Sequence, residues 1–206
     1  MLITAGAVVY AQQSPIDELR SKAEQGDARA QTELGKLYEE GKGIPASMAD
    51  AVSWYRKAAE QGDTDSQYVL ACLYEMGTMV PKSAANTLLW LRKAAEAGHA
   101  NAQCKLGSYY FEGLEGIPQD DKMAVYWFEK VAEQGQTDAQ FSLGVYYSSG
   151  QGIVKDSAKG ANLLKQAAEK GHAEAQMALA ALYCEGRGVS QSNDKAIEWL
   201  RRAEQQ

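Results

Sequence analysis

The sequence predicts an all-α protein, a solenoid of about five helix-pair repeats with a 36-residue period that follows a half-repeat helix near the N-terminus. The first observation is a glycine whose copies lie 36, 36, 37 and 36 residues apart, at Gly26, Gly62, Gly98, Gly135 and Gly171. The second is that a glutamine, a leucine and a tyrosine follow the same series, starting at Gln31, Leu34 and Tyr38. A fixed period of this kind indicates a repeat architecture.

Each period contains a first helix, which spans residues 28–40 in the first repeat. Apolar residues recur at i, i+4, i+7 and i+8 from Ala30, which is the spacing of one helical face. Only Gly or Ala occupies the Gly35 position in the five periods, which predicts close approach of a neighbouring helix. Gly41 ends the helix, and the repeated glutamine is predicted to be a buried amide that satisfies backbone groups of the adjacent turn.

The second helix spans residues 47–60 in the first repeat, with Ala51, Trp54 and Ala58 as its buried stripe. The Trp54 position holds Trp in four periods and Leu163 in the remaining one, which favours a core position over an exposed stacking platform. The helix begins at a residue suited to N-capping in every period, namely Ser47, Ser83, Asp120, Asp156 and Ser192.

Residues 14–206 form a single predicted solenoid domain. Residues 14–26 align with a second helix alone, and Pro15 suits the first position of that helix. The five predicted repeats are residues 28–62, 64–98, 100–135, 137–171 and 173–206.

The N-terminal residues 1–13 differ from the repeats because residues 2–13 form an uncharged apolar run. Small residues at Val9 and Ala11 fit a signal-peptidase site with cleavage before Gln12, although the usual basic segment is missing. We interpret the segment as the remnant of a secretory signal; an apolar cap on the first repeat is the alternative. The run is too short to span a bilayer. The predicted location is therefore periplasmic or secreted, and otherwise cytoplasmic.

The repeat also resembles a known family. Its pattern is A-x-A-Q-x-x-L-G-x-x-Y-x-x-G-x-G, then D/S-x-x-x-A-x-x-W and K-A-A-E-x-G, and is most complete in residues 30–62 and 139–171. This pattern resembles the Sel-one-like repeat, a relative of the tetratricopeptide repeat, over residues 14–206. The resemblance implies a right-handed α/α superhelix whose first helices line a concave face. It also implies an adaptor role in protein complexes, in bacteria often in the periplasm or at the host interface, and no shared catalytic residue.

A cysteine-rich subgroup of that family, linked to β-lactam binding, carries paired cysteines in each repeat. Here Cys72, Cys104 and Cys184 occupy three different repeat positions. We expect Cys72 and Cys104 to lie on the order of 10 Å apart on adjacent helices, too far for a disulfide. The activity of the subgroup is therefore not transferred to this chain.

Charge and motif spacing argue against nucleic-acid, metal and catalytic sites. The net charge is −6 and no Lys/Arg cluster is present to bind phosphates. His99 and His172 share one turn position two repeats apart, so their separation of roughly 20 Å prevents them from sharing an ion. Ser192 and Lys195 form an S-x-x-K motif, which in serine acylases places a hydroxyl beside an amine, but Ser192 is also the N-cap position. We predict no catalytic residue, cofactor or metal ion.

Partner binding is predicted where the repeats differ from one another. The first-helix positions i, i+4, i+7 and i+11 vary, and in the second repeat they include apolar side chains. The connection "EMGTMVPK" and the one-residue insertion in "EGLEGIP" add further apolar groups. The candidate partner-binding residues are Val69, Cys72, Met76, Met79, Lys105, Ser108, Glu112, Leu114 and Val145. The alternative is that Val69, Cys72 and Met76 only widen the core.

The leading functional hypothesis is a non-catalytic interaction scaffold, exported to the bacterial envelope, that binds a protein or peptide on its concave face. A periplasmic enzyme acting on cell-wall or β-lactam substrates, with Ser192 and Lys195 as its candidates, is the alternative from a different class. A toxin-immunity or host-factor-binding role also stays open. Self-association through the C-terminal repeat, residues 173–206, is a further hypothesis.

Overall fold

The computed structural model describes residues 14–114 and 116–205, so the interpretation of residues 1–13 as a signal remnant falls outside the described range. Within that range the chain forms eleven helices and no strand, which confirms the predicted all-α solenoid. The helices are α1 (Pro15–Glu24), α2 (Ala28–Glu40), α3 (Met48–Glu60), α4 (Thr64–Met76), α5 (Ala84–Glu96), α6 (Ala100–Glu112), α7 (Asp121–Glu133), α8 (Thr137–Ser149), α9 (Ser157–Glu169), α10 (Ala173–Glu185) and α11 (Asn193–Ala203).

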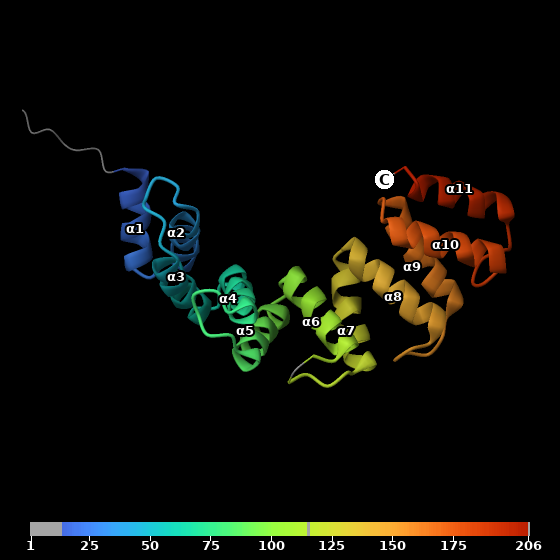
Figure 1. Cartoon of the computed structure of the whole chain (residues 1–206), viewed down its shortest axis with the longest axis horizontal. Coiled ribbons are helices and arrows are strands. Elements are labelled where there is room, and N and C mark those ends of the chain that lie inside the picture. The colour runs from blue at the N-terminus through green and yellow to red at the C-terminus, as the bar shows by residue number, and fades with distance from the viewer. Residues whose placement is uncertain (1–13, 115, 206) are drawn as a thin grey trace, which may run out of the picture.

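The helices form a curved array in which each helix packs mainly against the next one in the sequence (Figure 1). The helices α1 and α11 lie at opposite ends of this array, and α4 and α6 lie on the inner side of its bend (Figure 1). No helix in the described part of the chain is both long enough and apolar enough to cross a membrane.

Side-chain caps fix where the second helices begin. The predicted caps of α3, α5, α7, α9 and α11 are confirmed, because each side-chain oxygen accepts a hydrogen bond from a backbone N–H of the first turn. The first helices end at a glycine in the left-handed region, such as Gly41 with φ of 67°. These two signals set the length of every helix pair.

Buried amides join consecutive helices, as the sequence predicts. The side-chain nitrogen of Gln31 donates to the backbone oxygen of Ala23 at 2.9 Å, and Gln67, Gln103 and Gln176 make the same bond to the residue eight positions earlier. Gln140 departs from the pattern, since it pairs with the side chains of Gln166 and Lys170. The amides therefore satisfy backbone carbonyls at the ends of α1, α3, α5 and α9.

The predicted core stripe of the second helix is only partly correct. Trp90, Trp127 and Trp199 are buried, but Trp54 is half-buried and the Lys57 ammonium lies 3.9 Å from its ring centroid. The residue that follows Trp54, Tyr55, is fully buried instead. A Cβ at Gly35 would lie 2.8 Å from the Tyr55 ring, which explains why this repeat carries Gly at the position.

Candidate partner-binding surface

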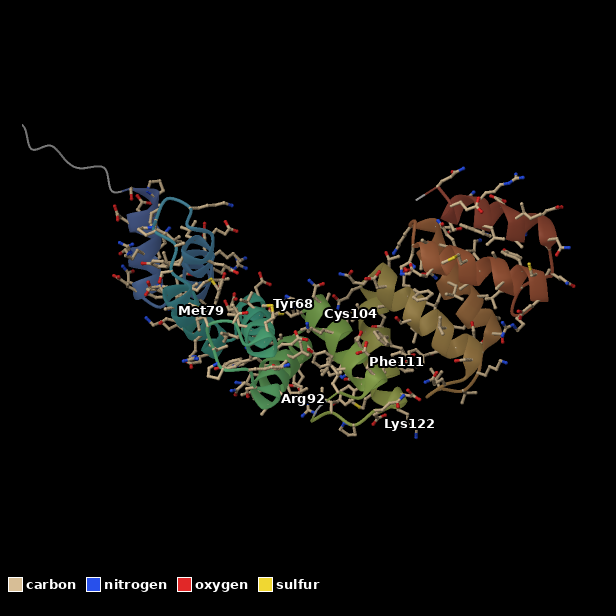
Figure 2. All side chains as sticks on the ribbon, viewed as in Figure 1. Tyr68, Met79, Arg92, Cys104, Phe111 and Lys122 are labelled. Carbon is tan, nitrogen blue, oxygen red and sulfur yellow. The ribbon has the colours of Figure 1, made fainter. Side chains whose placement is uncertain are left out.

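The variable first-helix positions i, i+4, i+7 and i+11 are exposed in the first repeat, whereas the two middle positions are half-buried in the second repeat. Arg29 and Glu33 are exposed, whereas Val69 and Cys72 are half-buried and Val69 packs against the core. Figure 2 places the neighbouring Tyr68 and Cys104 on the inner side of the curve, and Arg92 and Lys122 on its outer side. The inner surface therefore offers less free apolar area at Val69 and Cys72 than the sequence pattern suggests.

The apolar candidates near the ends of the helices are much more exposed. Met76 is 63% exposed at the end of α4, and Met79 is 62% exposed in the connection that follows. Met79 has a φ of 59°, the only positive value at a non-glycine residue in the described part of the chain. Glu112 is exposed at the end of α6. These side chains are free to meet a partner without rearrangement of the core.

Lys105 is engaged in a cluster around Glu75. Its ammonium lies 2.5 Å from a Glu75 carboxylate oxygen, and the Tyr109 hydroxyl donates a hydrogen bond to the same carboxylate. Burial by itself would raise the pKa of Glu75, but the hydrogen bonds from Lys105 and Tyr109 and the charges of Lys105 and Lys82 lower it overall. The carboxylate consequently links α4 to α6 as a charged group.

Glu75 and Tyr109 also border an apolar hollow between the two irregular connections, here called the loop cavity. Its volume is about 250 Å³, and it is lined by Glu75, Lys82, Ala84, Thr87, Leu88, Tyr109, Leu114 and Ile117. Lys82 comes from "EMGTMVPK", whereas Leu114 and Ile117 come from "EGLEGIP". The two departures from the repeat thus meet at one place in space.

A second apolar hollow, here called the inter-helix groove, lies between α6 and α8. Its volume is about 210 Å³, and it is lined by Ser108, Phe111, Phe128, Phe141, Ser142, Val145, Tyr146 and Gln151. Phe111 and Val145 are 43% and 42% exposed, so the groove opens between two apolar side chains. Ser108 and Val145 are therefore brought together, whereas Met79 and Leu114 are not part of this hollow.

Sequence reasoning missed the aromatic side chains of the inter-helix groove. Phe111 occupies the position of Glu39 and Glu75 in the earlier repeats, so a change from a carboxylate to an aromatic ring was visible in the sequence. Phe111 lies outside the four variable first-helix positions and the connections from which partner binding is predicted. The sequence also did not predict the α5 wall of the loop cavity, which Ala84, Thr87 and Leu88 form. This wall depends on how neighbouring repeats pack against each other.

The five repeats match a known sequence family individually. The Sel1 repeat model matches residues 28–63, 64–99, 100–136, 137–172 and 173–206. The chain belongs to the Sel1 repeat family. Sel1 repeat proteins in general mediate protein–protein interactions.

Solved structures give the same relationship. A Sel1 repeat protein from Oxalobacter formigenes is 34% identical with a TM-score of 0.86, and the match covers 94% of this chain and 79% of that one. The protein c5321 of uropathogenic Escherichia coli, a protective antigen with the same repeat fold, is 31% identical with a TM-score of 0.75 over 92% of this chain. This chain spans 48% of the E. coli protein. The immunity protein PA5088 of Pseudomonas aeruginosa is 21% identical with a TM-score of 0.52, which shows a shared fold. No curated protein matches the sequence.

The residues that could serve in catalysis or metal binding make structural contacts, chiefly helix caps, in this Sel1 repeat protein. The Ser192 hydroxyl accepts a hydrogen bond from the Lys195 backbone N–H at 3.3 Å, and the Lys195 ammonium lies 5.3 Å from the centroid of the Tyr183 ring. His99 and His172 cap α6 and α10, since each Nδ1 accepts a backbone N–H at 3.1 Å. Residues 14–114 and 116–205 contain no group of three His, Cys, Asp or Glu side chains arranged to hold a metal ion.

Proposed function

We propose that this Sel1 repeat protein is a non-catalytic scaffold that binds a protein or peptide on the inner surface of its curved array. The observation that carries this proposal is the apolar inter-helix groove between the first helices α6 and α8, which opens between the exposed side chains of Phe111 and Val145. Met76 adds an exposed apolar side chain at the end of α4. An apolar centre with a polar rim is the arrangement found in specific protein interfaces.

The size of the surface supports a macromolecular partner over a small molecule. Each hollow, at about 250 Å³ and 210 Å³, is smaller than the roughly 300–1,000 Å³ of typical small-molecule pockets. A row of first helices can instead supply many separate contacts, and specific complexes bury roughly 800 Å² on each partner. Single side chains of a partner fit such hollows better than a whole ligand does.

The test is affinity capture on immobilised protein from a bacterial envelope extract. The double change Met76→Asp with Val145→Asp places two charges at exposed apolar residues of the proposed surface, and we expect it to abolish capture of the specific partner. The matched control is Leu89→Asp with Val154→Asp, which adds the same charge at exposed apolar residues of α5 and of the α8–α9 connection. If both double variants capture the partner equally while their helicity is unchanged, the proposed surface is wrong.

We also propose export to the envelope, which rests on the apolar run of residues 2–13 alone. The full chain expressed in a bacterium should appear in the periplasmic fraction with its N-terminus at Gln12. A variant that lacks residues 1–11 should stay in the cytoplasm. Recovery of an uncleaved chain in the cytoplasm would contradict export.

A further inference from the structure

We infer that the inter-helix groove binds one large apolar side chain of a peptide segment that carries a basic residue close by, and that the Tyr146 hydroxyl binds a backbone carbonyl of this segment. The inference rests on the proposed scaffold function and adds the chemistry of the partner. It depends on three features of the groove: an unpartnered hydroxyl, aromatic walls and an acidic surrounding.

The hydroxyl of Tyr146 has no hydrogen-bond partner among residues 14–114 and 116–205, although the side chain is only 4% exposed. The equivalent residue of the preceding repeat, Tyr109, donates its hydroxyl to Glu75 on the neighbouring first helix. Tyr146 contacts the third repeat, where Phe111 occupies the position that Glu75 has in the second repeat. The carboxylate acceptor is therefore replaced by an aromatic ring. A buried hydroxyl without a partner is unfavourable. Tyr146 lines the groove, but its oxygen is covered in the free protein, so a bound segment satisfies the hydroxyl by displacing the side chains that cover it.

This hydroxyl is available as a donor and not as a charged group. Burial, and then the negative charge of Asp121, raises the pKa of Tyr146 well above its ordinary value. The proton therefore stays on the oxygen throughout the physiological range. An oxygen acceptor such as a peptide carbonyl is the group that completes this site.

The walls of the groove specify an apolar group next to that carbonyl. The rings of Phe111 and Phe128 lie 5.7 Å and 6.0 Å from the Tyr146 ring, the former edge to face. Ser108 of α6 and Phe141, Ser142 and Val145 of α8 supply the remaining first-helix surface. A hollow of about 210 Å³ with such walls suits a single Leu, Met or Phe side chain.

The charges around the groove favour a basic neighbour in the bound segment. Asp121 accepts hydrogen bonds from the Gln151 side chain at 3.2 Å, and Gln151 lines the groove. Glu112 is exposed on α6, one helical turn beyond Ser108. None of the described residues that line the groove is charged. Lys105, one turn before Ser108, is paired with Glu75, and Lys122 lies on the outer side of the curve (Figure 2). A Lys or Arg close to the apolar anchor would therefore find complementary charge at Asp121 and Glu112.

The experiment selects phage-displayed random 12-residue peptides on the immobilised full chain and titrates synthetic copies of the enriched sequences. We expect the enriched peptides to share a large apolar residue with Lys or Arg within a few positions of it. Val145→Asp should weaken their binding by more than about ten-fold, because a charge would enter the apolar mouth of the groove. Tyr146→Phe should weaken binding by about five-fold to ten-fold through loss of one hydrogen bond.

Tyr55→Phe is the control, since it removes a buried hydroxyl that donates to Glu39 within the first repeat, away from both hollows, and should leave peptide affinity unchanged. Enriched peptides that ignore Val145→Asp and Tyr146→Phe but are lost with Met76→Asp would overturn the groove assignment and leave the scaffold function standing. Enrichment of acidic peptides would overturn the partner chemistry. Failure to enrich any peptide that depends on the inner surface would count against both proposals.

Discussion

The imidazole of His99 stacks on the ring of Tyr68 in the preceding repeat, with centroids 4.7 Å apart and planes inclined by 22°. The same imidazole caps α6, because its Nδ1 accepts the Ala102 backbone N–H at 3.1 Å. Nδ1 is therefore unprotonated, and the proton lies on Nε2, which is 3.5 Å from an Asp65 carboxylate oxygen. One side chain thus starts a helix and joins it to the previous repeat.

Replacement of His99 separates these two roles. We expect His99→Asn to retain the cap and lose the stack, at a cost of about 0.5–1.5 kcal/mol in the free energy of unfolding. His99→Ala should lose both and cost about 1 kcal/mol more. Urea unfolding followed by circular dichroism measures the two values. Equal stability of the Asn and Ala variants would show that the cap contributes nothing.

Three of the four junctions between repeats have matched pairs of residues at these two positions; the junction of the third and fourth repeats has Cys104 and Gln136, and Gln136 makes no side-chain cap bond. Phe141 and His172 repeat the stack with centroids 4.6 Å apart. The junction between the first two repeats holds Thr32 and Asp63 instead, joined by a hydrogen bond of 2.9 Å. Where the N-cap residue is histidine, the preceding first helix supplies an aromatic ring; where it is aspartate, that helix supplies a hydroxyl. The sequence correctly placed the two histidines in turns, but it did not predict that their rings stack on the preceding repeat.

The sequence predicted what recurs and missed what depends on the angle between neighbouring repeats. The first and second helices were predictable because five copies of one pattern align within the chain, with glycines and N-cap residues at their ends. The burial of Tyr55 in place of Trp54 depends on how each second helix rotates against its neighbours. The loop cavity and the inter-helix groove arise between repeats, so their walls cannot be read from the period of one repeat.

A methyl group at Gly35 should destabilise the fold although alanine is the better helix former. The new Cβ would lie 2.8 Å from the Tyr55 ring, and overpacking typically costs about 1–3 kcal/mol against a gain of about 1 kcal/mol in helix propensity. The second repeat carries Ala71 and Leu91 at the same two positions, both fully buried. Gly35→Ala should therefore cost less in a Tyr55→Leu background, as a double-mutant cycle in urea would measure. An unchanged cost would contradict the proposed contact.

Two tyrosines at equivalent positions should respond oppositely to loss of their hydroxyls. Tyr109→Phe removes a hydrogen bond to the Glu75 carboxylate and should destabilise the protein by about 1–2 kcal/mol. Tyr146→Phe removes a buried hydroxyl that has no partner in the described part of the chain, and it should leave stability unchanged or slightly higher. The comparison controls for the loss of an identical atom. Equal destabilisation by the two changes would mean that the Tyr146 hydroxyl is satisfied in solution.

The three thiols should differ in their rates of alkylation. Cys184 is exposed, whereas Cys72 and Cys104 are half-buried. Burial raises the pKa of both inner thiols; the nearby ammonium of Lys105 and the hydrogen bond with Tyr68 partly offset this for Cys72, and the charge of Asp138 adds to it for Cys104. Iodoacetamide at neutral pH should label Cys184 at least about ten-fold faster, because the thiolate is the reactive form. Mass spectrometry of timed digests gives the rates, and a Cys184→Ser variant confirms which peptide carries the fast label.

The ion pair of Glu75 should make stability depend on pH in the acid range. Because the pKa of Glu75 is lowered in the folded protein, its stabilising effect is fully present above the ordinary value of 4.5 and is lost as the pH falls through the folded value. Glu75→Gln keeps an acceptor for the Tyr109 hydroxyl and removes the charge opposite Lys105. The variant should therefore be less stable than the wild type at pH 7, and the difference should shrink steadily below pH 4.5. Glu60→Gln, at an exposed residue of α3, controls for the loss of one negative charge. A difference between wild type and Glu75→Gln that stays constant from pH 7 to acid would show that the ion pair does not stabilise the junction of α4 and α6.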